Sequence, residues 1–213
     1  GDIGTIKAQA VLRNGGGWDW KAAENTPPYT ASDLVTDGVT GYKKLHVSID
    51  ITGGSDWEFS DITSLRAITP CLAGDTSTYK GKLYIDNVKL IDTSTPEETE
   101  KPSEPEKDPE GILIYKNDIN GEAAETELAK GVVKQLAEGN MAVEYEADLT
   151  QGWGKTLNAD SFQLDAEYTA GIKEKATMIF DVYFPDNAGD IGTIKAQAVL
   201  RNGGGWDWKA AEN

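Results

Sequence analysis

One segment of the chain occurs twice, and this repeat constrains the possible folds more than any other feature. Gly1–Asn25 reads GDIGTIKAQAVLRNGGGWDWKAAEN, and Gly189–Asn213 is identical to it, residue for residue. Divergence erodes natural repeats, so the identity points to an engineered duplication or to a fragment cut from two identical tandem copies. Two identical strands compete for one place in a sheet. We therefore expect the unused copy to stay disordered or to insert into another molecule as a strand-swapped oligomer.

A linker separates the two copies. Residues 93–111 read TSTPEETEKPSEPEKDPEG, which is rich in Pro, Glu and Lys and holds no large apolar residue. Such a segment cannot bury enough surface to fold, and its prolines keep it extended. We expect a module that starts near Ile112 and ends near Ile91. Residues 1–92 are then its second part and residues 112–213 its first part, with 189–213 repeating 1–25, so the module is circularly permuted.

Most of the remaining sequence predicts strands. Apolar and polar residues alternate, with β-branched and aromatic residues enriched, in Thr5–Leu12, Lys44–Ile51, Leu65–Leu72, Lys82–Ile91, Met141–Leu149 and Ala176–Phe184. Glu122–Glu138 has the composition of a helix, but Gly131, Val132 and Val133 at its centre argue against a long one. Several short strands separated by turns predict an all-β fold, here a circularly permuted jelly-roll β-sandwich.

The charge and the apolar pattern exclude two classes of partner. The formal net charge is −16, from 20 basic and 36 acidic residues. Nucleic acids and anionic membranes need a basic face, so neither is expected as a partner. No apolar run approaches the roughly 18 residues that a membrane span requires. Cys71 is the only cysteine, which rules out an intrachain disulfide and suggests a buried thiol.

Tryptophans in glycine-rich settings are the candidate ligand-binding residues. A flat indole covers the C–H face of a pyranose, and polar side chains at the rim then bind the hydroxyls. Trp153 lies in TQGWGK, and Trp18 and Trp20 lie in GGGWDWK, where a strand would put them on one face. Trp206 and Trp208 are their duplicates. Arg13, Gln9 and Lys21 are candidate partners for hydroxyls; the alternative for the tryptophan pair is that one ring packs under a loop.

Acidic residues at the two ends of the expected module suggest a structural calcium site. Asp86 lies in the apolar strand pattern YIDNV, and Asp118, Asn120 and Glu122 lie in KNDINGE. Calcium prefers several oxygen ligands from carboxylates and carbonyls. We expect Asp86, Asp118 and Glu122 to supply ligands; the alternative is that Asp86 accepts hydrogen bonds from loop backbone. His46, the only histidine, is expected to be structural.

In module order, four stretches resemble a known family. MIFDVYFP, KAQAVLRNGGGWDWK, GYKKLHVSIDI and GKLYIDNVKLI are together similar to carbohydrate-binding modules of the family 27 type, which are attached to bacterial β-mannanases. The resemblance implies a non-catalytic jelly roll that binds β-1,4-mannan and structural calcium, with stacking tryptophans at the WDW and QGWGK runs. The family also uses an early tryptophan, and none lies between Ile112 and Tyr145. Trp57 is a possible substitute, or a ring packed at a loop base.

These inferences favour one function over two others. We expect a secreted bacterial, extracellular binding module that holds an appended glycoside hydrolase against mannan or a related plant polysaccharide. The glycine-flanked tryptophans favour it over a structural spacer domain. The lack of a recognisable catalytic motif favours it over a small polysaccharide-degrading enzyme, although carboxylates are too abundant to exclude a glycosidase pair by counting.

Overall fold

The structure is a computed structural model, and it describes residues 6–7, 9–14, 19–25, 29–36, 38–51, 53–54, 57–58, 67–74, 76–94, 108–109, 111–117, 130–150, 157–160, 162–163, 175–186 and 194–201. Within these ranges nearly all regular structure is β-strand, and the single helical element is a short 3-10 turn, Ala31–Asp33. None of the described residues forms a helix that is long and apolar enough to cross a bilayer.

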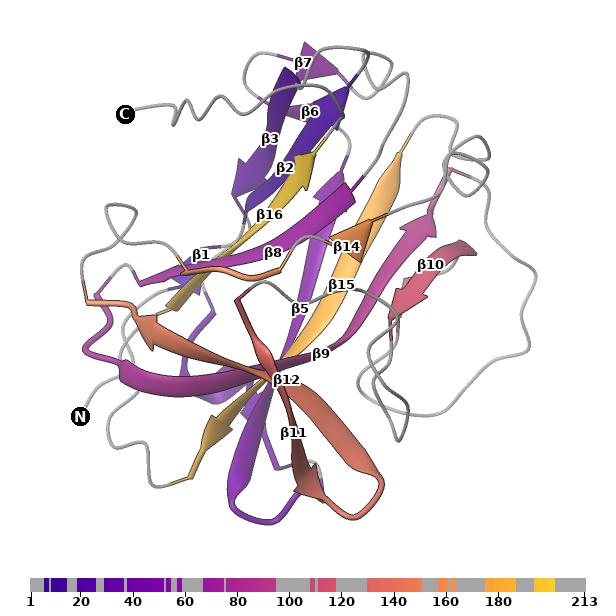
Figure 1. Ribbon diagram of the computed structural model, residues 1–213. Coiled ribbons are helices and arrows are strands. Elements are labelled where there is room, and N and C mark those ends of the chain that lie inside the picture. Colours follow the sequence, from indigo (N-terminus) through magenta and orange to yellow (C-terminus); the bar gives the residue numbers. More distant parts are fainter. Residues whose placement is uncertain are drawn as a thin grey trace.

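The described strands form two sheets of seven strands each and one small hairpin (Figure 1). The first sheet contains β1 (Ile6–Lys7), β2 (Gln9–Asn14), β3 (Asp19–Asn25), β8 (Ala67–Gly74), β13 (Leu157–Asn158), β14 (Phe162–Gln163) and β16 (Ile194–Arg201). The second contains β4 (Leu34–Val35), β5 (Tyr42–Ile51), β9 (Lys80–Asp92), β10 (Ile112–Asn117), β11 (Val132–Ala137), β12 (Asn140–Asp148) and β15 (Ala176–Pro185). The hairpin joins β6 (Gly53–Gly54) to β7 (Trp57–Glu58).

The second sheet has the order β11-β12-β9-β15-β5-β4, with β10 also paired to β9. Its strands form where apolar residues recur at every second position. In β5, Leu45, Val47 and Ile49 are buried, so the intervening His46 and Ser48 lie on the opposite face. β15 is buried along almost its whole length, and β5 and β9 pair with its two edges.

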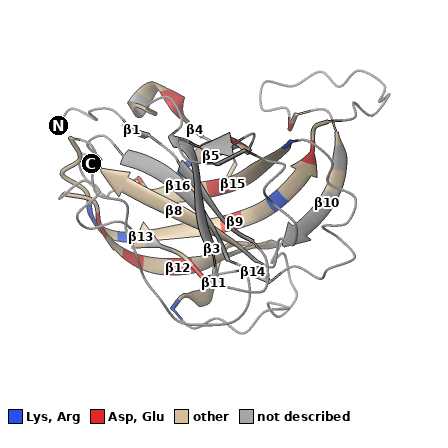
Figure 2. Ribbon diagram, turned by 90° about the horizontal axis from the view of Figure 1, so that it is seen from above, with Lys and Arg blue, Asp and Glu red and all other residues tan. Residues whose placement is uncertain are grey.

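The two sheets share one core, which makes the fold a sandwich. Ile68 and Leu72 of β8 pack in the same cluster as Val47 of β5 and Phe180 and Phe184 of β15. Each such side chain, when fully buried, contributes roughly 1.5–3 kcal/mol. Figure 2, which views the molecule from above, shows β8 of the first sheet together with β9, β12 and β15 of the second. The prediction of an all-β sandwich is confirmed, whereas the jelly-roll order and the circular permutation stay predictions.

Strands from before and after the linker alternate within the second sheet. β15 lies between β5 and β9 and pairs with both in antiparallel register. At the linker itself, Ile112 lies opposite Asp92, so the strand that enters the linker and the strand that leaves it are neighbours. Beside this pair, Lys89 Nζ lies 2.6 Å from Asp108 Oδ2.

The helix-forming composition of Glu122–Glu138 is misleading for its second half. Val132–Ala137 is a strand, β11, which pairs with β12 through a two-residue turn at Glu138 and Gly139. Gly139 has a φ of 75°, the left-handed conformation that such a turn requires and that glycine adopts without strain. The β-branched pair Val132 and Val133 therefore outweighs the helix formers around it.

The expected competition between the two repeat copies is not what the structure shows. β16 comes from the second copy and pairs with the full length of β8, while β2 and β3 of the first copy continue the same sheet beyond it. The expectation that one copy has no place in the sheet is therefore wrong. An extra strand can join because β16, once paired to β8, still has a free edge to offer.

Candidate functional site

The hairpin of β2 and β3 carries four of the predicted ligand-binding residues, which are Gln9, Arg13, Trp20 and Lys21. Arg13 lies directly opposite Trp20, and Gln9 lies opposite Asn25. Residues opposite one another in an antiparallel pair have Cβ atoms about 4.5–5.5 Å apart. The positions of Arg13 and Trp20 are therefore neighbours in the fold, although a glycine-rich stretch separates them in the sequence.

A second tryptophan position lies at the same end of the sandwich. Trp57 in β7 pairs with Gly54 in β6, and β6 lies against β3. Figure 1 shows β2, β3, β6 and β7 grouped at the top of the molecule. Trp57 is the residue that the sequence offers as a substitute for the early tryptophan, and this role stays a prediction.

The segment that contains Trp153 starts beside the residue that precedes β9 and ends beside β8. Leu149 N donates to Tyr79 O at 2.9 Å, and Ala159 N donates to Pro70 O at 3.0 Å. Leu157 lies opposite Leu72, toward one end of β8, whereas Ala67 at the other end is opposite Arg201, the duplicate of Arg13. At about 3.3 Å per residue, the positions of Leu72 and Ala67 are on the order of 17 Å apart along β8.

Several predicted site residues lie outside the described part of the chain. They are Trp18, Trp153, Trp206 and Trp208 of the predicted sugar platform and Asp118, Asn120 and Glu122 of the predicted calcium site. Their roles stay predictions.

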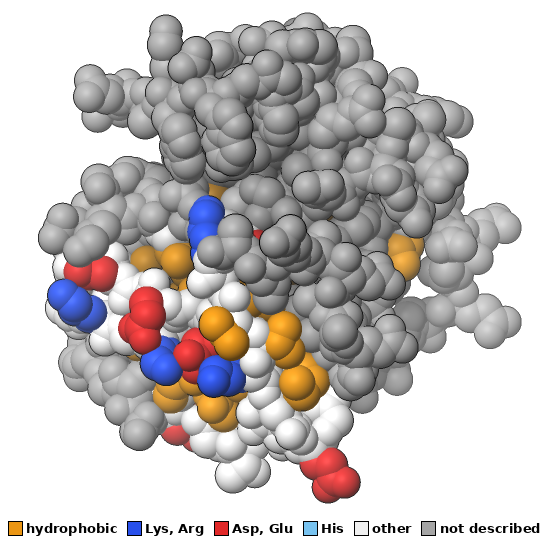
Figure 3. Space-filling view, viewed as in Figure 1, with side chains coloured by type: hydrophobic (Ala, Val, Ile, Leu, Met, Phe, Trp, Pro, Cys, Tyr) orange, Lys and Arg blue, Asp and Glu red, His pale blue; other side chains and the backbone are white. Residues whose placement is uncertain are grey.

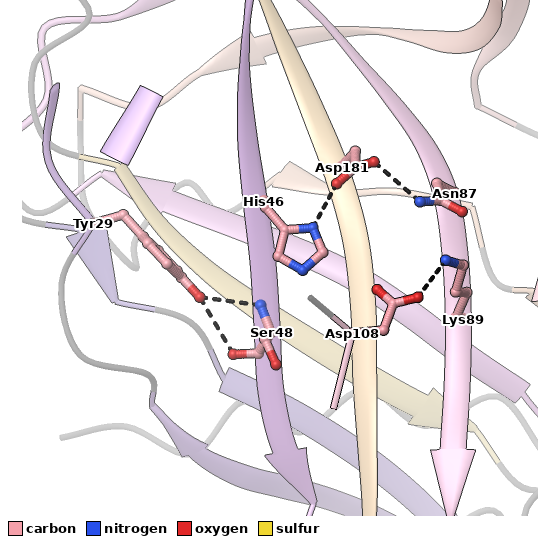
Figure 4. A network of polar contacts seen from close by, with 7 residues as sticks. All are labelled: Tyr29, His46, Ser48, Asn87, Lys89, Asp108 and Asp181. Atoms are coloured by element: carbon pink, nitrogen blue, oxygen red, sulfur yellow. Dashed lines mark hydrogen bonds and ion pairs between the residues drawn. The ribbon is translucent and has the colours of Figure 1, made fainter. Parts of the chain in front are cut away.

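A polar network occupies the face of the second sheet opposite the core (Figure 4). His46 Nδ1 lies 2.8 Å from Asp181 Oδ1, and Asn87 Nδ2 donates to Asp181 Oδ2 at 3.1 Å. On the same strand as His46, the backbone N–H of Ser48 donates to the hydroxyl of Tyr29. The hydrogen-bonding partner of the imidazole is thus a carboxylate from the neighbouring strand.

Asn87 reaches Asp181 because of a local irregularity in β9. Asn87 has a φ of 54°, and it is the one non-glycine residue with positive φ among the described residues. Ile85 and Val88 both face the core, so two residues stand between them where regular alternation allows one. This is the geometry of a β-bulge, and asparagine tolerates the left-handed conformation better than most residues.

Asp181 is held in its charged form. Burial alone would raise the pKa of this carboxyl group, but hydrogen bonds from His46 and Asn87, with electrostatic attraction from His46 and Lys44, lower it further than burial raises it. The pKa of Asp181 is therefore below its ordinary value. An ionised, buried carboxylate with two side-chain donors is a rigid structural unit, which agrees with the structural role expected of His46.

Asp86 is a buried carboxylate next to this network. It is 4% exposed and lies opposite Asp181 in the pairing of β9 with β15. Asn117, the last residue of β10, lies opposite Val88, and Asp118 follows Asn117 directly in the sequence. The described residues hold no group of three or more histidine, cysteine, aspartate or glutamate side chains that suits a metal ion. A calcium site at Asp86 would thus need ligands from the segment after Asn117.

Asp160 is a further buried carboxylate, and sequence reasoning missed it. Its Oδ1 accepts from the backbone N–H of Lys130 at 2.9 Å, and its Oδ2 accepts from the N–H of Gly131 at 2.8 Å and from the Tyr145 hydroxyl at 3.0 Å. These bonds join the start of β11, the middle of β12 and the segment after β13. The partners are far from Asp160 in sequence and two of them are backbone groups, so no sequence pattern marks the network.

Charged side chains of both signs alternate where β9 and β12 pair. Lys82 Nζ lies 2.8 Å from Glu144 Oε1, and Lys80 Nζ lies 3.2 Å from Asp148 Oδ2. Figure 3 shows basic and acidic side chains next to one another on the described part of this face. Since the opposite charges are interspersed, this region presents no basic surface of the kind that a polyanion needs.

The prediction of a buried thiol is confirmed, because Cys71 is fully buried in β8. Comparison of the chain with models of protein families, with curated proteins and with solved structures found no match. The family resemblance therefore depends on the sequence stretches alone.

Proposed function

We propose that the chain is a non-catalytic, extracellular carbohydrate-binding module that recognises β-1,4-mannan or mannooligosaccharides. In the parent protein it would hold an appended glycoside hydrolase against the polysaccharide. The supporting argument combines the fold, the charge and the tryptophans. A rigid β-sandwich carries ligand-binding loops well, and an uncharged ligand suits a chain of net charge −16.

One observation carries this proposal: Arg13 and Trp20 are cross-strand neighbours in the β2–β3 hairpin, beside the hairpin that bears Trp57. An indole face gives a sugar ring its apolar contact, and an adjacent guanidinium supplies donors for hydroxyl groups. Trp18 and Trp153 would extend the contact surface along the ligand.

We also propose a structural calcium ion bound by Asp86 with Asp118 and Glu122. The position of Asp86 supports this for two reasons. Its carboxylate is buried, and β10 ends at Asn117, opposite Val88, which is two residues after Asp86 in β9.

Titration calorimetry of the full chain with mannohexaose and with cellohexaose tests the proposal, combined with chromatography of the mixture for shorter products. Binding of mannohexaose without product supports a binding module. Product formation would show the polysaccharide-degrading enzyme instead. Neither heat nor product, with either sugar, would leave the structural spacer domain as the remaining interpretation.

A further inference from the structure

The two copies of the repeat lie side by side in one sheet, in parallel and in register. Ala10 of β2 is opposite Ala198 of β16, and Val11 is opposite Val199. Each of these residues is thus paired with its own duplicate. This is the only parallel pairing among the described strands, which otherwise pair antiparallel.

The same two copies also pair with β8 in one register. Ile6 in β1 and Ile194 in β16 both have Gly74 as partner, and Lys7 and Lys195 both have Ala73. The repeat therefore aligns with β8 in the same way whichever copy supplies it. A register that repeats in this way follows from the strand's own sequence and from β8, and not from the connections that lead to the strand.

Parallel, in-register pairing of identical strands needs no connecting turn. An antiparallel hairpin such as β2–β3 is set by its loop, whereas β2 and β16 are separated by most of the chain. Identical segments stacked in register match every backbone group and every side chain with its equivalent, which is also the way in which identical strands from different molecules pair. The covalent link between β2 and β16 supplies only their local concentration.

We propose that the repeat is a self-pairing element through which two copies of this chain associate, with β2 of one molecule pairing with β16 of its partner. Exchange of β1, β2 and β3 as one segment replaces each strand pairing between this segment and the rest of the chain by the same pairing between two molecules, which makes strand exchange a low-cost route to a dimer. If the exchange is not reciprocal, each molecule offers a β2 to the next and the assembly stays open. The exchanged segment carries Arg13 and Trp20, so in a dimer the proposed sugar site would combine these residues of one molecule with Trp57 of the other.

Paired cysteine variants test the exchange directly, in full-length protein with Cys71→Ala as background. One population carries Ala10→Cys and the other carries Ala198→Cys. They are unfolded, mixed, refolded together and oxidised, at protein concentrations from about 10 μM up to about 1 mM, the order of the effective concentration that a short flexible linker provides. A covalent dimer between the two populations forms only where β2 of one molecule lies beside β16 of another. The matched control replaces Ala198→Cys by Ala196→Cys, two residues out of register on the same strand.

We expect the dimer of Ala10→Cys with Ala198→Cys to exceed the out-of-register control severalfold and to increase with concentration. The double variant Ala10→Cys/Ala198→Cys should close within one chain at low concentration, which shows that the pairing itself forms. Closure of the double variant without any mixed dimer above the control would overturn the exchange. Failure of the double variant to close, with circular dichroism showing a folded protein, would overturn the self-pairing.

Discussion

His46 and Asp181 face each other across the pairing of β5 with β15, and the imidazole Nδ1 lies 2.8 Å from the carboxylate Oδ1. Asn87, from the bulge in β9, donates to the other carboxylate oxygen. Three adjacent strands are thus tied together at one buried anion, whose pKa is lowered because the two hydrogen bonds and the nearby positive charges outweigh its burial.

Asp181→Asn should destabilise the fold and flatten part of its acid unfolding. A carboxyl group whose folded pKa lies below its unfolded value of about 3.9 stabilises the native state above that pH, and the contribution is lost as the pH falls through the folded pKa. We expect a loss of about 1.5–3 kcal/mol at pH 7, the usual size for hydrogen bonds to a charged group. Urea unfolding from pH 7 down to about pH 2 measures it, with the difference between the two proteins shrinking below about pH 4.

Asp50→Asn is the matched control for this prediction. Asp50 lies on the same strand as His46, is exposed, and accepts one hydrogen bond from the Thr177 hydroxyl at 3.1 Å. Its replacement should cost less than about 1 kcal/mol. Two curves of stability against pH that run parallel for wild type and Asp181→Asn would show that Asp181 does not act through its charge.

Trp20→Ala should weaken mannohexaose binding, and Trp208→Ala should not. The two residues are chemically the same position of the repeat, but Trp20 belongs to the hairpin that pairs Arg13 with it beside β6. Loss of a stacked ring costs roughly 1–3 kcal/mol, so affinity should fall about tenfold or more. Calorimetry of both variants gives the comparison. Equal losses in both would mean that each copy binds, and affinity within about twofold of wild type for Trp20→Ala would exclude it from the site.

Calcium chelation should lower the melting temperature and leave sugar affinity nearly unchanged. A ligand that binds only the native state at 100 times its dissociation constant stabilises it by about 2.7 kcal/mol. Thermal unfolding with and without chelator measures this, and calorimetry far below the melting temperature measures the affinity. Asp86→Asn should remove the difference between the two melting curves. No shift in wild type after thorough chelation would eliminate the calcium site.

Strand positions were predictable where one face of the strand is buried. β5, β9, β12 and β15 lie within a few residues of the expected ranges because their core positions alternate or run continuously. β11 was harder, since only Val132 and Val133 contradict a helix-like composition. The bulge at Asn87 was not expected, because nothing in the run YIDNV distinguishes a bulged strand from a regular one.

The polar contacts were predictable only as isolated residues. His46 and Asp181 each interrupt an apolar strand, which marks them as polar groups in need of partners. Their pairing depends on which strands are neighbours, and strand order follows from the whole topology. The pairing of both repeat copies in one sheet was not foreseen for the same reason. We expected a single place for the repeat in the sheet and did not consider that β16, once paired with β8, offers its other edge to β2.

Asp160→Asn should destabilise the protein although it preserves shape and volume. The carboxylate accepts three hydrogen bonds, from two backbone N–H groups on different oxygens and from the Tyr145 hydroxyl. An amide has one acceptor oxygen, so its NH2 group must face at least one buried donor, which costs about 1–3 kcal/mol. Gly131→Ala should be at least as damaging, because the added Cβ would lie 2.1 Å from Val143 Cγ1. Glu146→Gln, on the same strand as Tyr145 but with a side chain that is 76% exposed, is the control and should change stability by less than about 0.5 kcal/mol. Urea unfolding of the three variants ranks them; an Asp160→Asn protein as stable as the control would show that ordered water or a local shift satisfies the donors without the charge.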